Sequence, residues 1–98
     1  MRRAAKVDTV QPEIVAAFRS MGCDVLHTHT LGKGAPDLVV VYSGIALLVE
    51  VKGAKGKLTE AQETLYSTLK TRPRIVRDIQ EAWGVVEVLK AWHRKIAA

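Results

Sequence analysis

The chain has 98 residues, of which 48% are hydrophobic and 26% are charged, with a formal net charge of +5. These values exclude a disordered polar chain and fit one globular domain over residues 1–98. No run approaches the roughly 20 apolar residues that a membrane-spanning helix needs, so no membrane partner is expected. The positive charge favours nucleic acid as the partner. A lone cysteine, Cys23, excludes an internal disulfide and fits a reducing cytoplasm.

The first predicted element is a helix that begins after Thr9 and ends at Gly22. Thr9 is a suitable N-cap, and Pro12 falls in the first turn, where its missing N–H is not needed. A short strand over residues 23–30 follows. Its alternation places one set of side chains on a single face, namely Cys23, Val25, His27 and His29.

The next two strands are predicted to form a hairpin. Two β-rich runs are separated only by Ser43 and Gly44, and a two-residue loop of this kind is typical of a β-hairpin. If these residues are the whole loop, Tyr42 pairs with Ile45. Both strands are apolar on both faces, so we expect helices to cover both sides of the sheet.

This register brings two carboxylates together at one end of the hairpin. Asp37 would lie directly across from Glu50 on the same face, with the side chains about 5 Å apart. Lys52 projects from that face too, because side chains alternate along a strand. Two anions at that separation repel by roughly 3 kcal/mol at an effective dielectric of about 20. A divalent cation would turn the repulsion into a binding site, whereas a one-residue slip in register would separate the pair.

A glycine-rich basic loop over residues 53–57 leads into the second predicted helix. Thr59 and Gln62 form a capping box at its start, and it continues to about Lys70. A short strand over residues 74–77 comes next. The residues expected to face inward from the helix are Leu58, Ala61, Leu65 and Leu69.

The last predicted element is an amphipathic helix opened by a second capping box, Asp78 with Glu81. The order of helix, three strands, helix, strand and helix predicts an α/β sandwich around a small mixed sheet. The inward positions of the last helix are Ile79, Ala82, Trp83, Val86, Leu89 and Ile96.

Each polar residue near the hairpin end also has an ordinary interpretation. Asp37 after a proline is typical of a turn, and Glu50 with Lys52 could be an incidental ion pair. All three together, beside loops that carry glycine and lysine, favour a site. The loop lysines that could contact DNA phosphates are Lys33, Lys55 and Lys57, although a single loop lysine is more often only solvated. No aromatic platform or recognition helix is evident, so sequence-specific recognition of DNA is not expected.

From Pro36-Asp37 to Glu50-Val51-Lys52 the chain resembles the PD-(D/E)XK nuclease superfamily, which has a restriction-endonuclease-like αβββαβα fold. The surrounding motifs are similar to small stand-alone VRR-NUC domains of phage and bacterial type. The matching segments extend over residues 8–90 and comprise residues 11–15, Gly22, His29, residues 32–38, 50–52, 57–62 and 76–78.

The resemblance implies Mg²⁺- or Mn²⁺-dependent hydrolysis of phosphodiester bonds in DNA. Asp37 and Glu50 would ligate the metal, and the main-chain carbonyl of Val51 would complete the protein ligands. Lys52 would orient the attacking water and stabilise negative charge on the phosphate.

Three further residues match family positions and have a second interpretation. Glu13 could complete the metal site through water, or it could favour the helix dipole. Gln62 could lie near the active site as well as cap the second helix. His29 could contact phosphate or be an ordinary strand histidine. A zinc site of His27 and His29 is rejected, because no third ligand stands nearby.

The resemblance also implies a structure-selective endonuclease that resolves Holliday junctions, a phage or prophage product acting in the host cytoplasm. Paired cuts by a chain with one active site need a homodimer, with Trp83 or Trp92 at its interface. A flap-cutting or nicking nuclease on the same fold is one alternative. A non-catalytic DNA-binding module is the other, and the intact Asp37, Glu50 and Lys52 argue against it.

Overall fold

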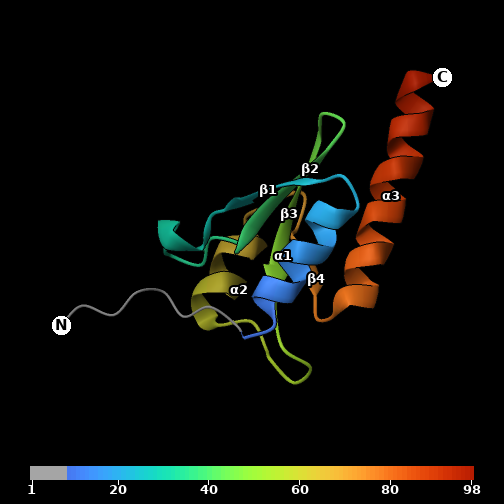
Figure 1. Cartoon of the computed structure of the whole chain (residues 1–98). Coiled ribbons are helices and arrows are strands. Elements are labelled where there is room, and N and C mark those ends of the chain that lie inside the picture. Colours follow the sequence, from blue (N-terminus) through green and yellow to red (C-terminus); the bar gives the residue numbers. More distant parts are fainter. Residues whose placement is uncertain (1–8) are drawn as a thin grey trace.

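The computed structural model describes residues 9–98, so the basic N-terminal residues 1–8 lie outside the described part. The order of elements is the predicted αβββαβα (Figure 1). None of the helices within residues 9–98 combines the length and apolar character needed to cross a membrane. The elements are α1 (Gln11–Ser20), β1 (Asp24–His27), the 3₁₀ helix η1 (His29–Leu31), β2 (Leu38–Tyr42), β3 (Ile45–Val51), α2 (Glu60–Ser67), β4 (Arg74–Val76) and α3 (Ile79–Ala97).

The four strands form one mixed sheet in the order β1-β2-β3-β4. Neighbours among the first three strands are antiparallel, and β4 runs parallel to β3. The predicted hairpin register is confirmed, since Tyr42 pairs with Ile45. Ser43 and Gly44 have φ angles of 48° and 83°, the left-handed conformation that a type I′ hairpin turn requires.

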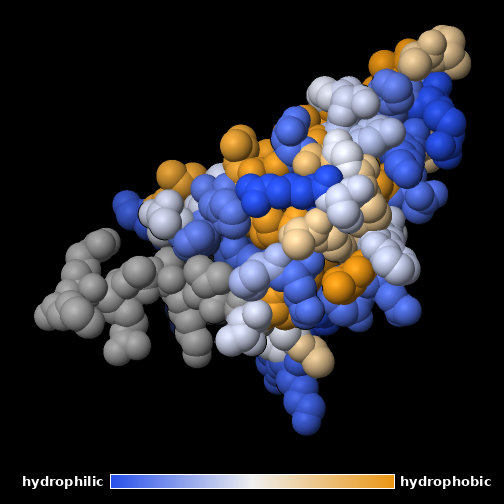
Figure 2. Space-filling model, viewed as in Figure 1, coloured by the Kyte–Doolittle hydropathy of each residue, from blue (hydrophilic) through white to orange (hydrophobic). Residues whose placement is uncertain are grey.

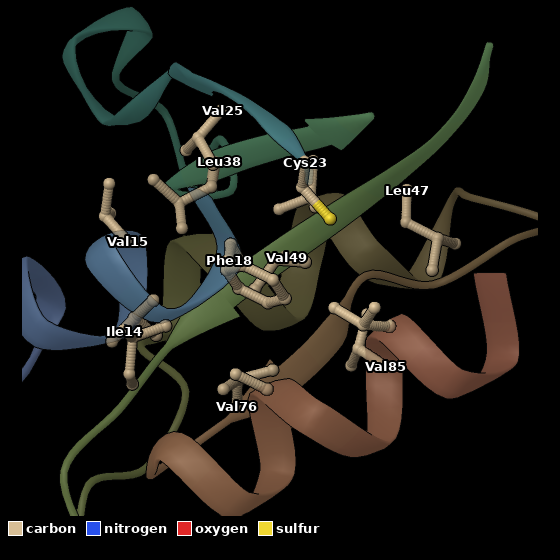
Figure 3. Close-up of a cluster of buried hydrophobic side chains, with 14 of the residues drawn as sticks. Ile14, Val15, Phe18, Cys23, Val25, Leu38, Leu47, Val49, Val76 and Val85 are labelled. Carbon is tan, nitrogen blue, oxygen red and sulfur yellow. The ribbon is translucent and has the colours of Figure 1, made fainter. Parts of the chain in front are cut away.

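The hydrophobic core lies between one face of the sheet and the helices α1 and α3. Ile14 and Phe18 of α1 are fully buried, and the ring of Phe18 lies beside Val49 of β3 (Figure 3). Val76 of β4 and Val85 of α3 complete this part of the cluster. Strand alternation places the even-numbered core residues of β2 and the odd-numbered ones of β3 on this face, because the hairpin pairs them with each other.

The opposite face of the sheet is covered only in part. Here α2 contributes a single buried residue, Tyr66. Leu26 and Ile75 share this face, because they pair with Val39 and Glu50, and they are 59% and 39% exposed. Helices were expected on both faces of the sheet. One face is covered by α1 and α3 as predicted, whereas α2 covers only one end of the other face.

Two predictions about the N-terminal half are wrong. The residue before α1 is Val10 rather than Thr9, and no side chain caps the helix. β1 ends at His27, so His29 lies in η1 instead of on a strand face. The predicted end of α1 is confirmed: Gly22, at φ +90°, closes a Schellman motif in which Cys23 N–H donates to the carbonyl of Phe18.

The predicted inward faces of the last two helices need correction. In α2, which ends at Ser67 rather than near Lys70, Ala61 is exposed and Tyr66 is the buried residue. In α3, Trp83 is 52% exposed and Ile96 is 74% exposed. The reason at the C-terminal end is geometric, since α3 extends beyond the edge of the sheet and has nothing there to pack against (Figure 1).

The loop between η1 and β2 is fastened to the start of α2 through Gly34. Gly34 has a φ angle of +84°, and a Cβ atom on it would lie 2.5 Å from the carbonyl oxygen of Ala61. Only glycine permits an approach this close. The loop that leads into Asp37 is therefore held against the helix that carries Gln62.

Replacing Gly34 by alanine should destabilise the protein by about 3 kcal/mol, because left-handed strain and a backbone clash add together. Gly44→Ala is the matched control, since Gly44 has a φ of +83° but open space around it. Its expected cost is about 1 kcal/mol, from strain alone. Urea unfolding of both variants measures the difference, and equal losses would contradict the close packing at Gly34.

Candidate active site

A polar cavity of about 340 Å³ lies at the end of the sheet where β3 finishes. It collects residues from three parts of the chain: the hairpin end, the loop after β3 and the start of α2. Its lining residues are Asp37, Glu50, Val51, Lys52, Gly56, Lys57, Thr59 and Gln62.

Asp37 is held by backbone groups on both sides. Its carboxylate oxygen Oδ2 accepts a hydrogen bond of 2.9 Å from the Val51 N–H. Its main-chain carbonyl accepts one of 2.8 Å from Thr28 N–H. The side chain is 7% exposed, so the hairpin register presents this carboxylate to the cavity with little freedom to move.

Glu50 is buried almost completely, and its carboxylate accepts hydrogen bonds from two side chains. Oε1 accepts from the Tyr66 hydroxyl at 3.1 Å, and Oε2 accepts from Gln62 Nε2 at 2.7 Å. The ammonium group of Lys52 lies 3.4 Å from Oε2. Donors from α2 and from the end of β3 thus fix the orientation of this carboxylate.

The electrostatics of the cavity disfavour two negative charges. Burial raises the pKa of Glu50, and the nearby carboxylate of Asp37 raises it further. Lys52, Tyr66 and Gln62 lower the pKa of Glu50 without cancelling the rise. Burial and the charge of Glu50 also raise the pKa of Tyr66, so its hydroxyl stays protonated and donates.

Two comparisons with known proteins bear on this geometry, and a comparison with curated proteins gives no match. The family model described as "VRR-NUC domain" matches residues 4–83. This chain belongs to the VRR-NUC family. A solved structure described as "VRR_NUC domain" is 25% identical, with a TM-score of 0.59, and the match covers 80% of this chain and 90% of that one. VRR-NUC domains are nuclease domains, which implies DNA as the substrate.

The structure of this VRR-NUC domain brings most of the sequence-predicted site residues together. The cavity contains Asp37, Glu50, Val51, Lys52, Lys57 and Gln62. The capping box also forms, with Thr59 and Gln62 bonded reciprocally. Gln62 therefore caps α2 and also lies in the cavity, where the structure adds a hydrogen bond to Glu50.

Four other predicted residues do not line this cavity. Glu13 is exposed on α1, which packs on the opposite face of the sheet. His29 lines a separate cavity beside the start of α1. Lys33 borders an apolar groove along α2, and Lys55 is exposed in the loop after β3.

Tyr66 is the site residue that sequence reasoning missed. It lies four residues after Gln62, so both side chains project from the same face of α2 toward Glu50. The four-residue spacing between Gln62 and Tyr66 was the sequence feature that could have predicted this role, because it places both side chains on one face of the helix. The inward face of α2 was instead predicted from its leucines, and that face does not include Tyr66.

The donor set fits a hard divalent cation. Within residues 9–98, no group of three or more His, Cys, Asp or Glu side chains could hold a metal by itself. Two carboxylates and a main-chain carbonyl remain, which suits Mg²⁺ because that ion keeps several of its waters. Burial and the neighbouring carboxylate of Asp37 raise the pKa of Glu50, and a cation held by both carboxylates would offset these two unfavourable effects.

The metal-free protein should lose stability as the pH rises above about 4.5, the ordinary pKa of glutamate. The folded protein holds a proton on Glu50 that the unfolded chain has already released, so raising the pH favours unfolding until the raised pKa is passed. Asp37→Asn removes one cause of the raised pKa and should flatten this part of the profile. Chemical unfolding between pH 4 and 8, with chelator present, measures both.

Asp24→Asn is the control, because Asp24 is an exposed aspartate on β1 away from the cavity. Its profile should follow that of the unaltered protein. Identical slopes for the unaltered protein and Asp37→Asn would show that the two carboxylates do not interact.

Proposed function

We propose that this VRR-NUC domain is a Mg²⁺- or Mn²⁺-dependent DNA endonuclease of the PD-(D/E)XK type, from the phage and bacterial branch. The observation that carries the proposal is the placement of Asp37, Glu50 and Lys52 in one cavity at the end of the hairpin. Structural stability alone does not explain two buried carboxylates on one face. Two carboxylates and a cationic side chain form a set that can support metal-assisted hydrolysis of phosphodiester bonds.

Asp37 and Glu50 would hold the cation with their carboxylates, and Val51 would add its main-chain carbonyl. When bound, the cation supplies Lewis-acid stabilisation of charge on the scissile phosphate. Glu13 is left out of this ligand set, because it does not line the cavity. Gln62 and Tyr66 keep Glu50 oriented while DNA enters and leaves.

Lys52 would act through its charge. Its side chain is 13% exposed and its ammonium group lies 3.4 Å from Glu50, which places a positive charge beside the carboxylates of the cavity. A cationic donor at this place orients the attacking water and stabilises the negative charge that develops on the phosphate. Lys57, which lines the same cavity, would bind the neighbouring phosphate of the DNA backbone.

We propose branched DNA, and four-way Holliday junctions first, as the substrate. The cavity is flanked by glycine- and lysine-bearing loops that suit backbone contacts, and DNA structure is recognised through the backbone. A flap-cutting or nicking nuclease would use the same residues, because substrate choice on one fold depends on loops and assembly. A panel of substrates therefore separates these activities.

Asp37→Asn should lower the cleavage rate by about 100-fold or more, since a cation ligand is lost. The assay incubates labelled four-way junction, flap, nicked, duplex and single-stranded DNA with Mg²⁺ or with chelator. Asp37→Asn should bind DNA at least as well as the unaltered protein, because it removes an anion beside the phosphate.

Asp24→Asn is again the control and should cleave normally. Cleavage in chelator, or undiminished cleavage by Asp37→Asn, would overturn the proposed chemistry. Metal-independent DNA binding without any cleavage by the unaltered protein would identify a non-catalytic DNA-binding module instead.

A homodimer is the proposed assembly, because one cavity per chain makes only one cut and a junction needs two. The C-terminal part of α3 projects from the body (Figure 1). Trp92 and Ile96 are exposed there at 40% and 74%, and they follow Leu89 on the same face of the helix. Trp83 points about half a turn away from Trp92, so one flat interface cannot contain both.

Trp92→Ala should shift the protein from dimer to monomer in sedimentation at micromolar concentration, whereas Trp83→Ala should not. Salt should strengthen the association, because the same segment carries Lys90, Arg94 and Lys95 and screening weakens their repulsion. A monomeric unaltered protein at micromolar concentration would remove the dimer from the proposal.

A further inference from the structure

Arg77 connects two parts of the chain that are distant in sequence. It lies between the end of β4 and Asp78, the N-cap of α3. One guanidinium nitrogen, Nη1, donates to the carbonyl of Gly53 at 2.6 Å and to the carbonyl of Gly56 at 2.8 Å. Both acceptors belong to the loop that follows β3.

The two carbonyls are the ends of a four-residue turn. Gly56 N–H donates to the carbonyl of Gly53 at 3.1 Å, so Arg77 bonds to both ends of a turn that this hydrogen bond closes. Lys55 lies within the turn, and Lys57 follows it and lines the active-site cavity. This loop projects from the lower edge of the molecule and is strongly hydrophilic (Figures 1 and 2).

The same turn packs against the proposed catalytic lysine. A Cβ atom on Gly56 would lie 3.3 Å from Cβ and 3.4 Å from Cδ of Lys52, so the backbone of Gly56 runs along the lysine stem. Arg77 therefore fixes the turn, and the turn limits where the stem of Lys52 can lie.

Arg77 is itself well anchored. Its main-chain N–H donates to Glu81 Oε1 at 2.7 Å, so the Glu81 carboxylate that was predicted to cap α3 bonds Arg77 instead of Asp78. The carbonyl of Val76 accepts from Lys52 N–H at 3.1 Å. The ion pairs among residues 9–98 do not include Arg77, so its positive charge is bonded to neutral carbonyls.

We propose that Arg77 is a positioning residue: it holds the 53–57 loop so that Lys52 and Lys57 face the DNA backbone together at the active-site cavity. The proposal rests on the proposed nuclease function. It adds that DNA binding also requires the 53–57 loop to be held in place, which the roles of Asp37 and Glu50 do not imply. We expect lysine to replace the arginine poorly, because the two N–H bonds of Nη1 have fixed directions in the guanidinium plane, whereas a lysine ammonium group is strongly hydrated and rotates on a flexible stem.

The first test needs neither DNA nor metal. In Arg77→Ala, hydrogen exchange of the Gly56 amide should become about tenfold faster or more, because the turn loses two hydrogen bonds to its carbonyls. Exchange of amides in the β2–β3 ladder should not change. Arg74→Ala is the matched control, since Arg74 is an exposed arginine on β4, three residues before Arg77. Equal exchange at Gly56 in both variants would overturn the proposal.

The second test measures DNA binding with Asp37→Asn as the background, so that the DNA stays intact. Adding Arg77→Ala should weaken binding of a four-way junction by about tenfold or more and reduce the slope of log affinity against log salt by more than about one unit. Adding Arg74→Ala should reduce that slope by about one unit or less. If Arg77→Ala reduces the salt slope more than Arg74→Ala does, contacts between lysines and phosphates are lost together with the arginine charge.

Arg77→Lys separates positioning from charge. It keeps the positive charge, so full recovery of DNA binding and of Gly56 protection would show that charge alone matters and would overturn the proposal. The expected result is fast Gly56 exchange and weak binding, as in Arg77→Ala. If the unaltered protein binds and cleaves no DNA, the nuclease function fails, and the exchange result still decides whether Arg77 holds the loop.

Discussion

The burial of two like charges in one cavity is the constraint on which the active-site end of this fold depends. Repulsion between Asp37 and Glu50 costs roughly 3 kcal/mol at about 5 Å. The hairpin that imposes the pairing buries several apolar side chains on its other face, and each contributes about 1.5–3 kcal/mol. The apolar face therefore outweighs the repulsion, and the register holds the carboxylates together.

The polar contacts around Glu50 offset only part of the cost of its burial and of its repulsion by Asp37. Hydrogen bonds to a charged group contribute about 1.5–3 kcal/mol each, and Glu50 receives them from Tyr66 and Gln62. Its pKa is nevertheless raised, which leaves a role for a cation. Because α2 buries only Tyr66, these same bonds are a large part of what attaches α2 to the sheet. Cation binding and the placement of α2 are therefore coupled through Glu50.

Prediction from the sequence was most successful where the residues of a turn and the apolar pattern of the flanking strands indicated the same structure. The two-residue turn and the alternating apolar strands predicted the hairpin, and with it the shared face of Asp37 and Glu50. Prediction failed where tertiary packing decides: Tyr66 is buried between α2 and the sheet, where Glu50 on the same face accepts a hydrogen bond from its hydroxyl, and helical periodicity does not reveal this contact. Trp83 fits the apolar stripe of α3 but is 52% exposed, so pattern alone placed it wrongly. The contact of Arg77 with the 53–57 loop is likewise invisible before the fold is known.

The glycines beside the active site are explained by close packing. A side chain on Gly34 would collide with the backbone of α2, and one on Gly56 would crowd the stem of Lys52. Both loops therefore lie against groups of the proposed active site: one contacts the helix that carries Gln62, and the other contacts Lys52, which follows β3. Glycine composition is commonly taken to indicate flexibility, yet at these two positions it permits contact. Loops fixed in this way present charge at defined positions, which is what discrimination between DNA structures requires when no base is read.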